Sequence, residues 1–213
     1  MSPLVGLLIS YVLGSIPSAY LAGRLRRGID LREHGSGNLG ATNVYRVLGA
    51  KVAAAVFLVD VAKGALPVLL LPDWTASPAA DHWRYAYGLA AIIGHVRPIF
   101  LLWKGGGKGV ATATGVFFAL APYATLTAFA TFVVTVYATG YVSLGSLCGA
   151  LVLAAVLLVR HGPQSALFVV GALVAAFVFW SHRANIARLR RGEEHRFGRR
   201  AKPAPSTSKG DAL

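Results

Sequence analysis

Three polar segments, far apart along the chain, carry the residue types best suited to binding an anion. Residues 34–46 combine three glycines and several small polar side chains with a histidine and an arginine. Residues 104–112 are a glycine run that leads through Lys108 into an apolar stretch, and residues 182–194 begin with His182 and Asn185 and continue with arginines. Unpaired backbone amides at glycine-rich turns and helix N-termini, with Lys and Arg beside them, favour phosphate ligands.

Each segment also has a plainer interpretation. The first could be an ordinary basic loop, the second a flexible hinge, and the third the end of a helix whose arginines extend to the membrane surface. The second is not a Walker A loop, because Val110 follows where Ser or Thr would be needed. The basic helix end explains the arginines but not His182 and Asn185, which share one helical stripe with Leu189.

The elements that must position these segments are membrane helices. The chain has 213 residues, of which 55% are hydrophobic and 14% charged, and its mean hydropathy is +0.59. Apolar runs of about 20 residues can cross a bilayer, whereas the residues behind the net charge of +13 lie between and after such runs. This composition excludes an ordinary soluble domain, and no nucleic-acid partner is expected. Because Cys148 is the only cysteine, neither a disulfide framework nor a multi-cysteine metal site is expected.

The positions of the basic residues predict the topology. The apolar run 3–23 is followed by arginines at 24, 26, 27 and 32, which places its end in the cytoplasm and the N-terminus outside. Further runs cover about 44–71, 85–103, 141–159 and 165–180, and residues 110–139 are nearly uncharged. If 110–139 were one helix, the arginine-rich stretch after residue 181 would lie outside, so we expect a break near Pro122.

We therefore predict an all-α integral membrane protein with seven transmembrane helices, some of them short, an outside N-terminus and a cytoplasmic C-terminus. All three polar segments would then lie on the cytoplasmic side. Residues 1–198 are expected to form a single transmembrane domain, followed by a basic disordered tail at 199–213.

Two patterns lie within the apolar runs themselves. Small residues recur every four positions in the first run, which predicts close packing between helices; they are Gly6, Ser10, Gly14 and Ser18. Asp60 and Lys63 are one helical turn apart and can neutralise each other in the membrane. The spacing alone leaves open whether this pair is structural or has a direct role.

The three segments resemble the signatures of the bacterial acyl-phosphate:glycerol-3-phosphate acyltransferase family. They read Gly35-Ser36-Gly37-Asn38-Leu39-Gly40-Ala41-Thr42-Asn43 with Arg46; Gly106-Gly107-Lys108-Gly109-Val110-Ala111-Thr112; and His182-Arg183-Ala184-Asn185-Ile186 with Arg188, Leu189, Gly192 and Glu193. The resemblance extends from the first helix to about Glu194. Arg97 stands where an apolar residue is expected and is a small departure.

The resemblance implies an enzyme of phospholipid biosynthesis in the bacterial inner membrane, with its active site facing the cytoplasm. Its activity would transfer a fatty acyl group from acyl phosphate to the 1-hydroxyl of glycerol 3-phosphate, giving lysophosphatidic acid and inorganic phosphate. The implied partners are these two substrates, membrane lipid and, transiently, the enzyme that makes acyl phosphate; no cofactor is implied. The expected catalytic residues are Ser36, Arg46, Lys108, His182 and Asn185. The expected substrate-binding or phosphate-binding residues are Gly37, Asn38, Thr42, Gly106, Gly107, Gly109 and Ser143, and Glu193 is expected to be structural.

Acyl phosphate has a good leaving group, so we expect direct attack by the glycerol hydroxyl, aided by positioning and charge stabilisation. An acylated Ser36 is the less favoured route, since the chain has no Gly-x-Ser-x-Gly elbow. Arg46 and Lys108 would neutralise the two phosphates, while Ser36 and Asn185 orient the hydroxyls. The proton would go to His182 or to a substrate phosphate.

Two other functions fit parts of the sequence. A transporter of a phosphorylated metabolite also needs cations within the membrane, but it favours polar or broken helices near the middle of the bilayer. A lipid-binding assembly protein would use the basic surface and leave the combination of Ser36, Lys108 and His182 without a purpose.

Overall fold

Helices make up nearly all of the regular structure in the computed structural model, which describes residues 1–197. No strand occurs among these residues, so the predicted all-α class is confirmed for them, while the predicted tail at 199–213 lies outside them. Short 3₁₀ turns lie at Leu31–Glu33, Pro72–Trp74 and Ile99–Leu101. The described helices are α1 (Pro3–Gly14), α2 (Ser18–Arg27), α3 (Ala41–Leu48), α4 (Ala50–Leu70), α5 (Ala80–Val96), α6 (Val110–Leu120), α7 (Pro122–Thr139), α8 (Val142–His161), α9 (Ala166–Ser181) and α10 (Arg183–Arg190).

Proline and glycine divide the apolar runs. The expected break near Pro122 is confirmed, since α6 ends at Leu120 and α7 begins at Pro122. The first run was expected to be continuous, but α1 ends before Pro17, which has no N–H to continue the helix. The run predicted at 44–71 is also divided, at Gly49, a residue of low helix propensity that separates α3 from α4.

Membrane-spanning length and composition are clearest in three segments. Pro3–Arg27, Ala50–Trp74 and Val142–His161 are long and apolar enough to cross a membrane, and α9 with α10 would make a fourth span bent by 57°. The apolar helix α6 has only 11 residues. The prediction of seven crossings also needs α5, α6 and α7 to cross, and it stays a prediction.

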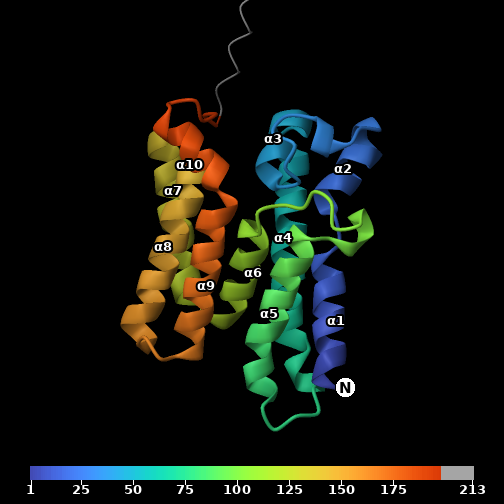
Figure 1. Ribbon diagram of the computed structural model, residues 1–213, viewed down its shortest axis with the longest axis vertical. Helices are drawn as coiled ribbons and strands as arrows, with labels where there is room; N and C mark the ends of the chain where they lie inside the picture. Colours follow the sequence, from blue (N-terminus) through green and yellow to red (C-terminus); the bar gives the residue numbers. More distant parts are fainter. Residues whose placement is uncertain (198–213) are drawn as a thin grey trace, which may run out of the picture.

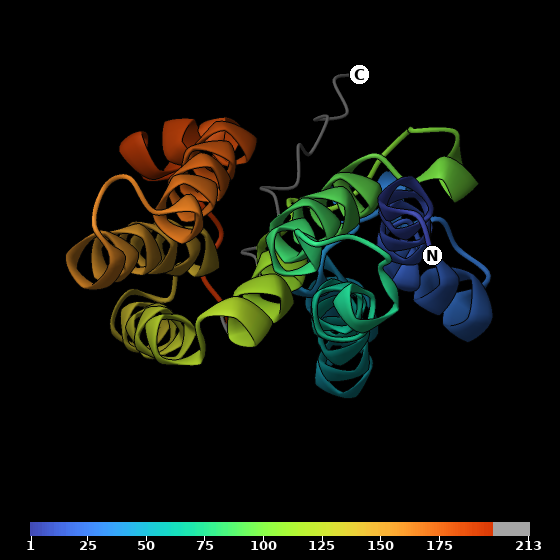
Figure 2. The same cartoon turned by 90° about the horizontal axis from the view of Figure 1, so that it is seen from below.

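The helices form two groups joined by α6. Figures 1 and 2 show α1, α4 and α5 on one side and α7, α8 and α9 on the other, with α6 between them. The close crossing of α4 and α6 depends on small residues, because a Cβ added at Gly115 would lie 1.9 Å from the carbonyl oxygen of Val61. A Cβ at Gly14 would lie 2.1 Å from the carbonyl oxygen of Ala91 on α5. The small-residue stripe of α1 is therefore a packing surface, as predicted.

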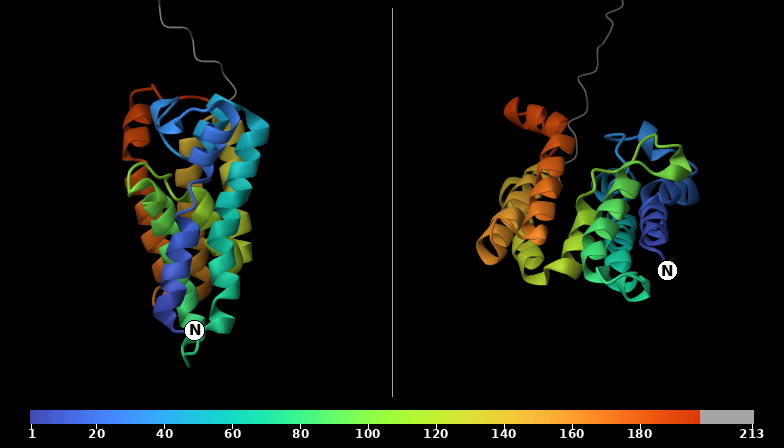
Figure 3. Two further views of the ribbon diagram at one scale, coloured as in Figure 1. Left: turned by 90° about the vertical axis from the view of Figure 1, so that its right-hand side faces the viewer. Right: turned by 60° about the horizontal axis from the view of Figure 1, so that its bottom comes forward.

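The three polar segments meet at one end of this bundle. In Figures 1 and 3, α3, the loop before α6 and α10 all lie at the end opposite the N-terminus. Since α4 and α6 run away from this end and α9 runs toward it, their polar termini come together there. The helix order therefore produces the gathering that the charge pattern predicted.

Candidate active site

A polar cavity of about 340 Å³ lies where the three segments meet. Ten of the expected catalytic and binding residues line it: Ser36, Gly37, Asn38, Thr42, Arg46, Lys108, Gly109, Ser143, His182 and Asn185. They come from the loop before α3, from α3, from the loop before α6, from the start of α8, and from the junction of α9 with α10. The cavity thus combines hydroxyl and amide side chains with basic ones, and its lining also includes Arg188, His95, His195 and the carboxylates of Asp60 and Glu194.

Asn43 holds the first loop in shape, and the sequence analysis did not assign it this role. Its Oδ1 accepts a hydrogen bond of 2.8 Å from the backbone N–H of Ser36. Its Nδ2 donates to the carbonyl oxygens of Leu31 and His34, at 3.2 and 3.0 Å. A Cβ at position 35 would lie 2.2 Å from the Asn43 Oδ1, which explains the glycine there. The buried amide therefore fixes where Ser36 meets the cavity.

The second loop divides its residues between two places. Lys108 and Gly109 line the polar cavity, but Gly106 and Gly107 line a small separate cavity beside Ser18 and Lys63. A Cβ at Gly107 would lie 2.0 Å from the Nε2 of His95 on α5, and the Gly107 N–H donates to the His95 carbonyl oxygen at 3.3 Å. Gly106 and Gly107 therefore pack closely against the end of α5, and their expected contact with substrate stays a prediction.

His182 lies at the junction of α9 and α10, beyond the apolar helix, and its side chain is buried. Its Nδ1 donates a 2.8 Å hydrogen bond to the carbonyl oxygen of Val178, which leaves Nε2 as an acceptor. Burial and the positive charge of Lys108 lower the pKa of His182 to about 4. At neutral pH the imidazole is therefore uncharged, with one nitrogen free to take a proton.

Glu194 is the carboxylate that organises the third segment, and the sequence analysis missed it. Its Oε1 accepts hydrogen bonds from Ser143 Oγ at 2.8 Å and Asn185 Nδ2 at 2.6 Å, while its Oε2 accepts from Arg188 Nε at 2.7 Å. Burial alone would raise its pKa, but these bonds hold the pKa below the usual value for glutamate. Glu193, which was expected to be structural, is exposed, and within residues 1–197 its carboxylate pairs only with the exposed Arg191, at 2.7 Å.

Lys108 and Asn185 link the second and third segments directly. The ammonium of Lys108 donates to the Oδ1 of Asn185, whose amide nitrogen is held by Glu194. Burial lowers the pKa of Lys108 to about 8; the Glu194 carboxylate opposes this, and the guanidinium groups of Arg188 and Arg46 add to it. Lys108 is therefore a cation at neutral pH that an incoming anion would stabilise further.

Asp60 and Lys63 form the ion pair that their spacing predicted, with Nζ and Oδ1 2.8 Å apart and both side chains buried. Lys63 also donates to the carbonyl oxygen of Ile16, at 2.9 Å, where the α1 helix has ended. Ser18, the first residue of α2, donates to the Asp60 Oδ1 at 2.7 Å. The pair therefore satisfies backbone and side-chain groups at the break made by Pro17.

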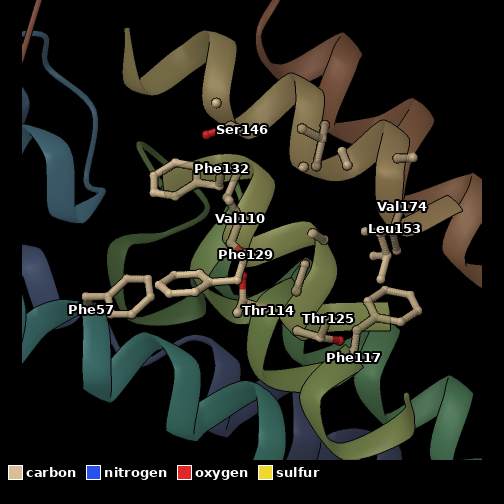
Figure 4. Close-up of a pocket in the computed structure, with 17 residues that line it drawn as sticks. Phe57, Val110, Thr114, Phe117, Thr125, Phe129, Phe132, Ser146, Leu153 and Val174 are labelled. Atoms are coloured by element: carbon tan, nitrogen blue, oxygen red, sulfur yellow. The ribbon is translucent and has the colours of Figure 1, made fainter. Parts of the chain in front are cut away.

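An apolar cavity joins the polar one on the side of α7 and α8. Figure 4 shows it between Phe57 and Phe129 at one side and Leu153 and Val174 at the other. Its lining is almost entirely hydrophobic, and it shares four residues with the polar cavity: Phe57, Val110, Phe132 and Ser146. A ligand with an anionic head and an apolar chain could therefore occupy both.

The polar cavity also opens into a wide vestibule at the end of the bundle. Ser36, Thr42 and Arg46 line both spaces. Residues 192–197 form one wall of the vestibule, where the ring of Phe197 stacks on Tyr45 with centroids 4.3 Å apart. A water-soluble molecule could therefore reach the cations without passing through the apolar cavity.

Comparison with known proteins gives one consistent result. Residues 4–192, which include all five expected catalytic residues, match the family model described as Glycerol-3-phosphate acyltransferase. Glycerol-3-phosphate acyltransferases of Trichlorobacter lovleyi and Parasynechococcus marenigrum are 49% and 46% identical, over 88% and 94% of this chain and 94% and 92% of their own lengths. Two crystal structures of PlsY (YgiH), an integral membrane glycerol 3-phosphate acyltransferase, are similar over 92% of this chain. Its glycerol 3-phosphate form has a TM-score of 0.83 at 39% identity and 96% coverage, and its lysophosphatidic acid form 0.81 at 38% and 95%.

Proposed function

This chain belongs to the glycerol-3-phosphate acyltransferase family, and we propose that it transfers a fatty acyl group from acyl phosphate to the 1-hydroxyl of glycerol 3-phosphate. The products would be lysophosphatidic acid and inorganic phosphate. One observation carries the proposal: a cavity lined by the basic side chains of Arg46, Lys108 and Arg188 adjoins an apolar cavity, and the two share the lining residues Phe57, Val110, Phe132 and Ser146. That shape fits a donor with a phosphate at one end and an acyl chain at the other, and the forms of PlsY named above contain the acceptor and the product.

In this proposal Lys108 and Arg46 neutralise the phosphates of donor and acceptor. The backbone at Gly109 and Val110, where α6 begins, adds the favourable end of a helix dipole. Ser36 and Asn185 orient the glycerol hydroxyls, and Thr42 and Asn38 complete the polar wall. The primary hydroxyl attacks the acyl carbonyl carbon, the bond from that carbon to the phosphate oxygen breaks, and inorganic phosphate leaves with the electron pair. Fixed charges and positioning supply the rate enhancement without a covalent enzyme intermediate.

The proton of the attacking hydroxyl goes to the Nε2 of His182 or to a substrate phosphate. The low pKa of His182 in the free protein would rise when anionic substrates bind beside it. We expect His182→Ala to lower kcat by about 10²-fold or more if His182 is the base. His161→Ala, at the far end of α8, is the control. Nearly full turnover by His182→Ala would assign the proton to the substrate phosphate.

The activity assay uses purified protein in detergent or vesicles and measures phosphate release and lysophosphatidic acid. Release is expected only when acyl phosphate and glycerol 3-phosphate are both present. Acyl coenzyme A in place of acyl phosphate should give no product. Turnover with the coenzyme A donor alone would contradict the proposed donor, and phosphate release without glycerol 3-phosphate would contradict the proposed acceptor.

A transporter of phosphorylated metabolites is less well supported. Beside the polar cavity lie the apolar cavity and a buried apolar cluster that includes Val68, Ile92, Val116 and Phe117. A pathway across the membrane would have to pass through this cluster. Uptake of glycerol 3-phosphate into vesicles containing the protein, without acyl transfer, would favour the transporter.

We place the protein in the bacterial inner membrane with seven crossings, the N-terminus outside and the polar cavity facing the cytoplasm, where it would meet the enzyme that supplies acyl phosphate. The support is the basic character of the end that holds the polar segments. Single cysteines near residues 30 and 190, introduced after Cys148 has been replaced, should resist membrane-impermeant labelling of intact cells. Labelling near residue 190 from outside would contradict this orientation.

A further inference from the structure

Asp60 has one carboxylate oxygen that no donor within residues 1–197 satisfies. Its side chain is 1% exposed and lines the polar cavity. Among the residues that the structure describes, Oδ2 has no hydrogen-bond partner, although it is fully buried. A buried carboxylate oxygen without a donor is costly, and in most proteins such an atom meets a ligand or an ordered water.

The two groups at bonding distance from Asp60, Ser18 and Lys63, both contact Oδ1. Ser18 Oγ and Lys63 Nζ donate to Oδ1 at 2.7 and 2.8 Å, and the nearest nitrogen of His95 is 3.6 Å from Oδ1. The ammonium of Lys63 balances the carboxylate charge. Oδ2 therefore offers one oriented acceptor in a place where the charge of Asp60 is already compensated.

The position of Asp60 limits what this acceptor can bind. Phe57, which precedes Asp60 by one helical turn on α4, lines both the polar and the apolar cavity. Asp60 therefore lies beside the junction of the cavities. A carboxylate oxygen repels phosphate and accepts only from donors, so its ligand must bring a hydroxyl or similar group to this junction.

We propose that Oδ2 of Asp60 accepts a hydrogen bond from the secondary hydroxyl of glycerol 3-phosphate and makes the site specific for it; this rests on the proposed function of the cavity. In the proposed function the phosphate of glycerol 3-phosphate contacts Lys108 and Arg46, and the primary hydroxyl loses its proton in the reaction. The secondary hydroxyl keeps its proton throughout and is the donor that remains. Asp60 thus holds the middle of the molecule, which directs the primary hydroxyl toward the acyl carbonyl.

The test compares binding of glycerol 3-phosphate with binding of 1,3-propanediol monophosphate, which lacks the secondary hydroxyl. Calorimetry on the purified protein without a donor measures both dissociation constants. The unchanged protein should bind glycerol 3-phosphate about tenfold more tightly, as expected for a hydrogen bond to a charged acceptor. In Asp60→Asn a neutral amide replaces the charged acceptor at Oδ2. The secondary hydroxyl can accept from this amide, but the bond is weaker than one to a carboxylate, so the preference should fall to about threefold or less.

Asp30→Asn is the matched control, because Asp30 is also buried but pairs with Arg32 and does not line the cavity. Any loss it causes should be equal for the two ligands. If Asp60→Asn does not fold, the double variant Asp60→Asn with Lys63→Met removes both charges together, and the preference should be reduced there as well.

Two results would overturn the proposal: no preference in the unchanged protein, or a preference that stays undiminished in both Asp60 variants. Either would assign Oδ2 to an ordered water. The binding test contains no acyl donor, so its result does not depend on which acyl donor the enzyme uses. If the proposed acyl donor were wrong, the activity assay would show no phosphate release, while the protein would still distinguish the two ligands.

Discussion

Two buried carboxylates line the same cavity, and the protein treats them differently. Both oxygens of Glu194 accept hydrogen bonds, from Ser143 on α8 and from Asn185 and Arg188 on α10. Asp60 has its donors on Oδ1 alone, and Oδ2 faces no protein donor in the part of the chain that the structure describes. Glu194 therefore holds neighbouring side chains in place, whereas Asp60 leaves one acceptor oxygen available to a ligand.

The backbone around each carboxylate explains the difference. Asp60 lies inside the long helix α4, which fixes its position without help from side chains. Glu194 follows the end of α10, where the chain has no regular structure, so its place depends on the hydrogen bonds it receives. A carboxylate that is held by its helix can leave one oxygen for a ligand, and one that is held by its donors cannot.

The largest expected effect comes from removing the partner of Asp60. Lys63→Met leaves the Asp60 charge buried and unpaired, which should lower the free energy of unfolding by about 3–5 kcal/mol. Arg84→Met is the comparison, because it removes the basic partner of Asp81 from a surface ion pair with the same three-residue spacing. It should lower the free energy of unfolding by less than about 1 kcal/mol. Thermal unfolding in detergent, followed by circular dichroism, compares the two. Equal losses in the free energy of unfolding would show that burial does not make the Asp60–Lys63 pair more important for stability than a surface pair.

The scaffold role of Glu194 predicts a smaller effect, seen first in activity. Glu194→Gln turns one acceptor oxygen into a donor that faces Arg188, so Asn185 and Lys108 lose part of their support. We expect kcat/KM to fall by about 10- to 100-fold, the value of one or two hydrogen bonds to a charged group. Glu193→Gln is the neighbouring control and should change kcat/KM by less than about twofold, because Glu193 is exposed and screened. If the two variants behave alike, Glu194 is not the organising carboxylate.

Much of this arrangement could be predicted because it depends on local patterns. The charge distribution indicated that the three polar segments share one end of the molecule, and the structure brings them around one cavity. The spacing of Asp60 and Lys63 predicted their ion pair, and Pro122 predicted a helix break. The number of membrane crossings does not follow from such patterns, because α6 is short for a span and the α9–α10 pair is bent.

The rest depends on contacts that spacing does not encode. Glu193 and Glu194 are adjacent, and the turn at Gly192, where φ is +71°, and the donors Ser143, Asn185 and Arg188 place Glu194 inward. The packing of Gly107 against His95 and the hold of Asn43 on the first loop join residues whose pairing has no periodic signal. Resemblance to a family supplies residue types at such positions but not their partners.

The two carboxylates also differ in their effect on the pH dependence of the site, because Glu194 is the nearest negative charge that supports Lys108. With a pKa of about 8, Lys108 is a cation below that pH and loses its charge as the pH rises through it. The kcat/KM for glycerol 3-phosphate should therefore fall above about pH 8, since this parameter reports the free enzyme. Bound phosphate stabilises the ammonium, so the fall in kcat should begin at higher pH.

Glu194→Gln removes a charge that raises the pKa of Lys108, so it should move the fall in kcat/KM to lower pH, whereas Asp60→Asn should leave that fall at the same pH. A limb that shifts in the Asp60 variant and not in the Glu194 variant would reverse the roles assigned to the two carboxylates.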